Sequence, residues 1–254
     1  MTPDQHLRQV LANNIVDMGP NSPVRQMRAA FLPLLRNWAG NYLLSVEPSG
    51  SFAKGTAVRS GTDIDLFISL HPTTPDTLQN IHNTLIKAVQ AAGFSPKRQT
   101  MSIGVRDANN HYDVDLVPAK KRADNTGDHS LYHHKSGTAR KTNIGRHVNQ
   151  VLYSGRLDEI RLLKIWRNQK RLDFPSFYLE LTVIAALVGR PIGNLADNVA
   201  HVLIYLRDTF PNARVADPAV PTNAVSDDLT VAERLLIKKA ANDALKQTWT
   251  QLIT

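Results

Sequence analysis

Apolar residues recur at helical spacing near the start of the chain and again over most of the sequence after Asn143. The spacing predicts two opening helices within residues 2–38, separated by the turn Gly19-Pro20-Asn21-Ser22-Pro23. Further helices are predicted over residues 77–92, 146–153, 157–170, 176–188, 194–209 and 230–253. A Pro-rich interval at 211–221 separates the last two helices.

Short apolar runs bounded by turn residues lie between the first and second groups of helices, and they predict strands over residues 42–46, 63–70, 98–105, 111–117 and 131–134. The strands 98–105 and 111–117 form a pair joined around Asp107-Ala-Asn-Asn. The fold class is therefore α+β, with a small mixed sheet flanked by helices and a separate helical bundle. We expect the opening helices (1–38) to pack across both lobes, a mixed α/β domain over 39–142, and a helical domain over 143–254.

Composition excludes several classes of protein. The 254 residues include no Cys, which rules out disulfides, thiolate zinc sites and Cys nucleophiles and favours a reducing compartment such as the cytoplasm. A charged fraction of 20% is too low for a disordered polyelectrolyte. The most apolar stretch, residues 179–188, contains Glu180 and is too short to span a bilayer, so no membrane segment is expected.

Positive charge is concentrated in one segment. Residues 120–171 carry 13 Lys and Arg against 4 Asp and Glu, a net charge of +9, whereas the chain as a whole carries +8. Such a local field suits a partner that carries phosphates, such as a nucleoside triphosphate, RNA or DNA. A solvated basic surface is the alternative interpretation, and Lys120-Lys-Arg122 within the segment fits either.

Gly50 and Ser51 follow the first predicted strand. A Gly in this place lets the backbone approach a triphosphate closely, and a helix that starts beyond it presents free N–H groups to phosphate oxygens. The Ser51 hydroxyl adds a donor. The pair predicts a phosphate-binding turn.

Two carboxylates, Asp63 and Asp65, flank Ile64 at the start of the second predicted strand. Side chains two residues apart in a strand share one face at roughly 6–7 Å, while Ile64 faces the core. Carboxylates beside phosphates repel unless divalent cations lie between them, and a pair of Mg²⁺ (or Mn²⁺) ions about 3.5–4 Å apart can activate a hydroxyl and stabilise leaving pyrophosphate. The pattern predicts a metal site, although Asp-x-Asp on a strand can also be an edge device.

A third acid is expected from a neighbouring strand, where Asp113 and Asp115 share one face. We assign the role to Asp115. It would hold the metal on the acceptor side and help to take the proton from the incoming hydroxyl, while Asp63 and Asp65 bridge both metals.

Gly-Ser, a spacer, Asp-x-Asp and a later Asp on a strand resemble the DNA polymerase β nucleotidyltransferase superfamily. Within it, several segments resemble the branch that holds oligoadenylate synthases, bacterial cyclic-oligonucleotide synthases (CD-NTases) and class I CCA-adding enzymes, over about residues 40–250. These segments are Gly50-Ser-x-x-x-Gly-Thr, Thr62-Asp-Ile-Asp-Leu, Val114-Asp-Leu-Val-Pro-Ala119, Leu162-Leu-Lys-Ile-Trp166, Ser176-Phe-Tyr-Leu-Glu180 and Asp217-Pro-Ala-Val-Pro-Thr-Asn223.

The resemblance implies roles for individual residues. Asp63, Asp65 and Asp115 would be the metal ligands, and Gly50 and Ser51 would cradle the triphosphate. Lys164 and Ser176 would contact its phosphates from the helical lobe, across a cleft. The chain length leaves no room for the body and tail domains of CCA-adding enzymes, which favours the compact synthase-like members, and a Cys-free chain lacks the Cys/His zinc element that senses double-stranded nucleic acid.

Other conspicuous residues have structural interpretations beside functional ones. Ser176 follows Pro175 and would cap its helix, and Glu180 in the same apolar helix is expected to pair with a cation. The polar stripe of helix 157–170 (Arg161, Lys164, Asn168 and Arg171) is typical of a solvated face unless it binds phosphate. Burial is favoured over base stacking for Tyr132, Trp166 and Tyr178, and the spacing of His129, His133, His134 and His147 does not favour a metal site.

The leading hypothesis is a template-independent nucleotidyltransferase that moves a nucleoside monophosphate from a nucleoside triphosphate to a ribose hydroxyl, making a linear or cyclic oligonucleotide. The basic segment 120–171 keeps open an enzyme that extends RNA 3′ ends, of the tRNA CCA type. A nucleic-acid-binding or toxin–antitoxin protein that keeps the fold without turnover, and an enzyme that nucleotidylates protein, are further alternatives.

Overall fold

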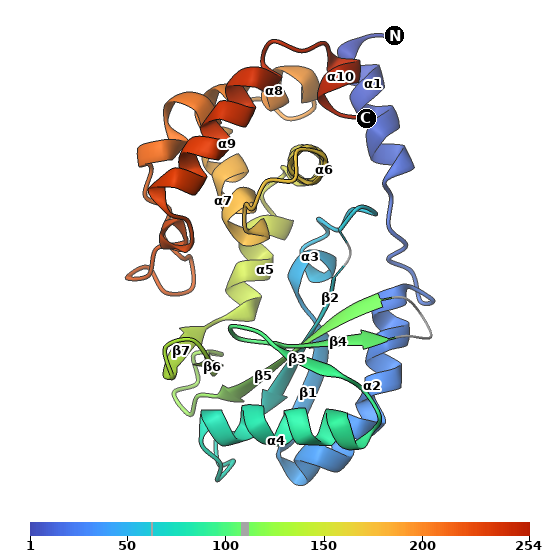
Figure 1. The fold of residues 1–254 in the computed structure, drawn as a ribbon, viewed down its shortest axis with the longest axis vertical. Helices are drawn as coiled ribbons and strands as arrows, with labels where there is room; N and C mark the ends of the chain where they lie inside the picture. Colours follow the sequence, from blue (N-terminus) through green and yellow to red (C-terminus); the bar gives the residue numbers. More distant parts are fainter. Residues whose placement is uncertain (62, 108–111) are drawn as a thin grey trace. The chain divides into compact units, whose positions relative to one another are not determined.

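The structure, a computed structural model, describes residues 1–61, 63–107 and 112–254 and confirms the α+β fold class (Figure 1). The helices are α1 (Pro3–Asn13), α2 (Pro23–Ala39), α3 (Gly50–Ala53), α4 (Leu78–Ala91), α5 (Ile144–Leu152), α6 (Leu157–Gln169), α7 (Ser176–Ala186), α8 (Leu195–Asp208), α9 (Val231–Ala244) and α10 (Trp249–Leu252). The strands are β1 (Leu43–Pro48), β2 (Ile64–Leu70), β3 (Pro96–Arg98), β4 (Ile103–Asp107), β5 (Tyr112–Lys121), β6 (His129–His133) and β7 (Thr138–Thr142).

The chain divides into two compact units. We call residues 17–54 and the described part of 62–148 the sheet unit, and residues 1–16, 55–61 and 149–254 the helical unit. Of the opening helices, α1 belongs to the helical unit and α2 to the sheet unit. The predicted domain boundaries, between residues 38 and 39 and between residues 142 and 143, remain predictions.

A mixed sheet forms the centre of the sheet unit (Figure 1). Its described strands follow the order β1-β2-β5-β4-β3, and β6 pairs with the C-terminal part of β5 and with β7. β2 and β5 are parallel, whereas the other paired strands are antiparallel. The predicted pairing of the strands on either side of residue 107 is confirmed as the antiparallel pair β4 and β5.

Strand alternation separates an apolar face of the sheet from a face that carries acids. Ile64, Leu66 and Val114 are fully buried, and α2 and α4 pack against the sheet. Asp65 and Asp115 point to the opposite face, because successive side chains of a strand alternate. Burial of the apolar set therefore fixes the direction of the two carboxylates.

Aromatic side chains form the centre of the helical unit. Trp166 and Tyr178 are fully buried, and the rings of Phe174, Tyr178 and Phe210 contact one another with centroids 5.1–5.3 Å apart. Tyr132 is also buried, within the sheet unit. The prediction that Tyr132, Trp166 and Tyr178 are core residues is confirmed. In this structure none of these three rings is exposed for base stacking.

The structure corrects two predicted elements and adds one strand. The strand 98–105 is two strands, β3 and β4, because Gln99 N–H donates to the carbonyl oxygen of Ser102 (3.0 Å) and closes a turn. β7 was not predicted, since four of its five residues are exposed and it has no apolar alternation. The helix 230–253 is divided into α9 and α10, because Thr248 caps a new helix in a reciprocal box with Gln251. Thr62 and the predicted turn at Ala108-Asn-Asn lie outside the described residues.

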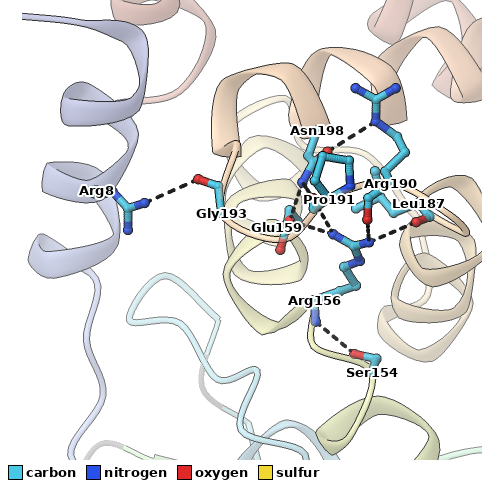
Figure 2. Close-up of polar contacts among 9 residues, drawn as sticks. All are labelled: Arg8, Ser154, Arg156, Glu159, Leu187, Arg190, Pro191, Gly193 and Asn198. Atoms are coloured by element: carbon cyan, nitrogen blue, oxygen red, sulfur yellow. Dashed lines mark hydrogen bonds and ion pairs between the residues drawn. The ribbon is translucent and has the colours of Figure 1, made fainter.

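A buried guanidinium joins three parts of the helical unit (Figure 2). Arg156, which precedes α6, donates to three carbonyl oxygens after α7, those of Leu187 (3.0 Å), Arg190 (2.5 Å) and Pro191 (3.2 Å). Its Nη1 lies 3.4 Å from Glu159 Oε1, which also accepts from Asn198 of α8 (2.8 Å). The Arg156 cation therefore balances a buried carboxylate and satisfies carbonyl groups at the end of a helix.

We expect Arg156→Met to lower the free energy of unfolding by about 3 kcal/mol, because it leaves Glu159 buried without its cation. Urea unfolding measures the change. Arg207→Met is the matched control, since the ion pair of Arg207 with Asp208 is exposed and the loss should be small. Equal losses of unfolding free energy in the two variants would contradict the role of Arg156 as the cation that balances buried Glu159.

Candidate active site

Asp65 and Asp115 are direct neighbours across the parallel pair β2 and β5. Each is half-buried and points to the face of the sheet opposite the buried apolar residues. Adjacent strands lie about 4.8 Å apart, so the two carboxylates share one small region. The expectation that the third acid comes from a neighbouring strand is confirmed, whereas its role as a metal ligand stays a prediction.

Asp63 directly precedes β2 and is exposed. Burial raises the pKa of Asp115 above its usual value, and the negative charge of Asp63 raises that pKa further. Hydrogen bonds from Ser102 and Gln99 act in the opposite direction. Asp63 is thus close enough to Asp115 for the two charges to interact.

Gly50 lies against the carboxylate of Asp65. It begins α3 with a φ of +56°, and a Cβ atom at this position would lie 1.7 Å from Asp65 Oδ2. Ser49 N–H donates to the Asp65 carbonyl oxygen (2.8 Å), which joins the residue before the turn to β2. The left-handed backbone and the lack of space for a Cβ atom both require Gly at position 50. The predicted phosphate-binding turn, formed by Gly50 and Ser51, therefore adjoins Asp65.

Asp113, the other acid on this face of β5, is in a different environment. Its side chain is exposed, and its nearest described cation is Arg106 at 3.9 Å, where the Asp113 Oδ1 and Arg106 Nε atoms approach. Asp115, by contrast, is half-buried and opposite Asp65. The choice of Asp115 over Asp113 agrees with this geometry.

Sequence reasoning missed two residues that contact Asp115. Gln99 Nε2 donates to Asp115 Oδ1 (2.9 Å), and Ser102 Oγ lies 3.4 Å from Asp115 Oδ2. Both were placed inside a continuous predicted strand, so no pattern in the sequence indicated a turn that would direct them to this carboxylate. They became visible only through the hairpin of β3 and β4.

The acids offer hard oxygen donors, the ligands that Mg²⁺ and Mn²⁺ prefer. Repulsion between the charges of Asp63 and Asp115 is a strain that a divalent cation would relieve. Among the described residues, no three His, Asp or Glu side chains are grouped as a preformed metal site. The donor chemistry fits a divalent cation, and the final approach of the ligands would accompany binding.

In the helical unit, Lys164 and Glu180 form a buried ion pair with an Nζ–Oε1 distance of 2.6 Å. The hydroxyl of Thr56 donates to Glu180 Oε1 (2.6 Å) and accepts from Lys164 Nζ (3.0 Å). The expectation that Glu180 pairs with a cation is confirmed. Contact between Lys164 and phosphate stays a prediction. Lys164 also has a structural role, because its ammonium group neutralises the buried carboxylate of Glu180.

The polar stripe of α6 holds the segment 55–61. Arg161 donates to the Gly55 carbonyl oxygen (3.0 Å), Lys164 to Thr56, and Asn168 to Ser60 Oγ (3.1 Å). These donors, spaced by three and four residues, are therefore engaged by the chain itself. The interpretation as a solvated face is wrong for them.

Ser176 is the first residue of α7 and not its cap, because Pro175 occupies the capping position. The Ser176 hydroxyl is exposed and accepts a hydrogen bond from Arg167 Nη1 (2.9 Å). The capping interpretation was wrong, since the extended Pro175 ends the preceding loop one residue earlier. Phosphate binding by Ser176 stays a prediction.

Part of the basic segment is neutralised by its own acids. Lys141 lies 2.5 Å from the buried Asp128, and Arg122 lies 2.9 Å from Asp124. Arg156, Arg161 and Lys164 also form ion pairs, with N–O distances of 2.6–3.4 Å. The net charge of +9 already counts all of these acids except Glu180, which lies outside the segment, so only the Lys164–Glu180 pair lowers the charge further.

Comparison with known proteins finds cyclic-oligonucleotide synthases and, among the solved structures, also the Cid1 poly(U) polymerase (14% identity, TM-score 0.68, covering 96% of this chain and 93% of that chain). The cyclic AMP-AMP-AMP synthase of Escherichia coli (strain MS 115-1) is 26% identical over 235 residues, which is 78% of this chain and 73% of the synthase. The structure of E. coli MS115-1 CdnC with ATP has 24% identity and a TM-score of 0.76, covering 96% of this chain and 90% of that chain. The CD-NTase CdnG of Bradyrhizobium diazoefficiens with GTP has 15% identity and a TM-score of 0.79, covering 97% and 91%. No protein-family model matches the chain.

These similarities confirm the resemblance that the motifs indicate. In sequence and in fold, the chain is similar to the CD-NTase branch of the nucleotidyltransferase superfamily. Along the described ranges, no helix is both long and apolar enough to cross a membrane.

We expect Asp115→Asn to stabilise the protein in the absence of divalent cations. The unfolded state releases the Asp115 proton near the ordinary value of 3.8, whereas the folded state holds it to higher pH. The folded wild type therefore loses stability as pH rises from that value through the raised pKa. The gain in Tm of the variant should be largest near about pH 7 and should shrink toward about pH 3.5.

Thermal unfolding in EDTA across this pH range measures the effect. Asp113→Asn is the matched control, because the side chain of Asp113 is exposed on the same face of β5. A Tm difference for Asp115→Asn that does not vary with pH would contradict the electrostatic explanation.

We expect Lys164→Met to lower the free energy of unfolding by about 3 kcal/mol, because it strips Glu180 of a buried cation partner. Lys239→Met, on the exposed face of α9, is the control. Denaturant unfolding and nucleotide binding are measured together. Weaker nucleotide binding with unchanged stability would show that Lys164 serves phosphate rather than the fold.

Proposed function

We propose that the protein is a template-independent nucleotidyltransferase that joins nucleoside monophosphates, taken from nucleoside triphosphates, into a cyclic oligonucleotide and releases pyrophosphate. The observation that carries this proposal is the in-register pair of Asp65 and Asp115 beside Gly50. The 26% identity to a cyclic AMP-AMP-AMP synthase supports the choice of product class and makes ATP a candidate substrate.

Gly50 and Ser51 would bind the triphosphate. The left-handed backbone of Gly50, without a side chain, lets phosphate oxygens approach main-chain N–H groups beside Asp65, and the Ser51 hydroxyl adds a donor. Binding at this turn would orient the α-phosphate toward the acids of β2 and β5.

Asp115 would accept the proton of the attacking ribose hydroxyl. A carboxylate with a raised pKa is a stronger base than an ordinary Asp. Burial and the nearby charge of Asp63 both raise the pKa of Asp115, which suits it to this role. Transfer then forms a bond from the hydroxyl oxygen to the α-phosphorus and breaks the bond to pyrophosphate, which takes the electron pair.

Asp63, Asp65 and Asp115 would hold Mg²⁺ or Mn²⁺. Such cations, when bound, neutralise phosphate charge and stabilise the leaving pyrophosphate. We also propose that Ser176 contacts phosphate, which is supported by its exposed hydroxyl beside the Arg167 guanidinium. The same role for Lys164 has less support, because its ammonium is bound to Glu180.

Extension of RNA 3′ ends is the second candidate, favoured by the net charge of +9 over residues 120–171. The pairing of Lys164 with Glu180, an acid outside the segment, removes one of these positive charges from the field that an RNA would meet. Loss of turnover, as in a binding or toxin–antitoxin protein, is disfavoured because the three acids are present. We place the protein in the cytoplasm, where a Cys-free nucleotide-consuming enzyme finds its substrates.

We expect purified protein to convert labelled ATP, alone or with the other nucleoside triphosphates, into a small product that resists phosphatase, because a cyclic oligonucleotide has no terminal phosphate. Mass spectrometry identifies the product and its size. Asp65→Asn should lower the rate more than about 100-fold, since loss of a ligand costs at least as much as loss of a supporting residue.

Asp113→Asn should retain activity and serves as the control for charge on the same face.

A parallel reaction contains tRNA. Label that enters only the tRNA would refute the cyclic product in favour of RNA extension, and full activity in Asp65→Asn would refute the assignment of the acids.

A further inference from the structure

The turn between β3 and β4 carries a polar network that ends on Asp115. Gln99 Nε2 donates to Asp115 Oδ1 at 2.9 Å, and Ser102 Oγ donates to Gln99 Oε1 at 2.6 Å. Ser102 is buried and Asp115 is half-buried, so little water competes for these contacts. A carboxylate assigned to the active site is thus bound by a neutral amide from another strand.

The direction of each hydrogen bond is determined by chemistry. A carboxylate only accepts, so Gln99 must present its NH₂ group to Asp115 and its carbonyl oxygen to the other side. Ser102 has one hydroxyl proton, and the shorter contact, 2.6 Å to Gln99 Oε1 against 3.4 Å to Asp115 Oδ2, takes it. Ser102 therefore orients the Gln99 amide, and Gln99 orients the carboxylate.

Gly104 provides the space for this contact. It lies directly opposite Asp115 in the antiparallel pair β4 and β5. A Cβ atom on Gly104 would lie 2.7 Å from Gln99 Nε2 and 3.3 Å from Asp115 Oδ1. Any larger residue would push the flexible amide end of Gln99 away from the carboxylate, while the strands themselves could remain paired.

The turn itself is held from three directions. Gln99 N–H donates to the Ser102 carbonyl oxygen (3.0 Å), and His134 N–H donates to the Thr100 carbonyl oxygen (2.8 Å). The ring of the buried His82 contacts the Ser102 carbonyl oxygen through Nε2 at 3.4 Å. These contacts come from the hairpin, from the residue after β6 and from α4, and they hold the backbone that carries the Gln99 and Ser102 side chains.

We propose that Gln99 is a positioning residue that holds the Asp115 carboxylate in the orientation required to bind a divalent cation, with Ser102 and Gly104 as its supports. The inference rests on the proposed function for its assignment of Asp115. Residues that hydrogen-bond a metal-binding carboxylate set its direction, and their loss usually lowers metal affinity or activity about 10–100-fold. Gln99 would act through Asp115 and would not contact the nucleotide.

The test uses the full chain and two variants that break the same contact in different ways. Gln99→Leu removes the donor, and Gly104→Ala displaces it. Mn²⁺ binding without nucleotide, measured by electron paramagnetic resonance, should weaken at least about 10-fold in both. At saturating ATP and a fixed Mg²⁺ concentration kcat should fall about 10–100-fold with KM for ATP little changed, and higher Mg²⁺ should restore part of kcat.

Gln90→Leu, an exposed Gln on α4, is the matched control and should behave as wild type. Ser102→Ala should give an intermediate loss, because Gln99 keeps its amide but loses its orientation. Should Gln99→Leu fold poorly, Gly104→Ala carries the test, since it keeps the Gln99 side chain and only moves its amide. Mn²⁺ affinity and kcat at wild-type values in a folded Gly104→Ala or Gln99→Leu protein would overturn the proposal.

The two proposals fail in distinguishable ways. A wild type that makes no oligonucleotide but binds Mn²⁺, with weaker binding in Gln99→Leu and Gly104→Ala, would refute the function and retain the positioning role. A wild type that is active while both variants match it would refute the positioning role alone. A wild type that binds no Mn²⁺ would overturn the positioning role whatever product is made.

Discussion

The parallel pairing of β2 with β5 places two carboxylates side by side, and the rest of the candidate site is arranged around them. Asp65 and Asp115 are opposite each other in this register, and burial raises the pKa of Asp115. Like charges at this spacing oppose pairing of the strands. The register is maintained because the alternate residues of the same strands, such as Ile64 and Val114, are fully buried, and a slip by one residue would exchange the two faces.

Each of the two acids is faced by a glycine. Gly50 makes room for the Asp65 carboxylate, and Gly104 makes room for Asp115 together with the amide of Gln99. Gly50 also has a left-handed backbone conformation, which favours Gly. The lack of a side chain there therefore both allows the turn and leaves space for the Asp65 carboxylate. The sheet unit therefore combines charges that disfavour the fold with backbone positions that accommodate them.

Buried charges in the helical unit follow a different rule, because they have partners of opposite sign within the unit. Lys164 pairs with Glu180, and Arg156 pairs with Glu159 and with backbone carbonyl groups. These contacts fix α6 to the segment 55–61 and to the end of α7. Two cations of the basic segment, Arg156 and Lys164, are thus buried and stabilise the fold.

The sequence by itself determined most of the helices, the central strands, the α+β class and the acids Asp63, Asp65 and Asp115 as candidates beside Gly50. These features depend on local spacing and on short motifs, which a single chain segment contains in full. The sequence could not identify Gln99, Ser102 and Gly104 as neighbours of Asp115, or Thr56 as a partner of Lys164 and Glu180. Those contacts join residues far apart in the chain, and only strand register and helix packing bring them within hydrogen-bond distance.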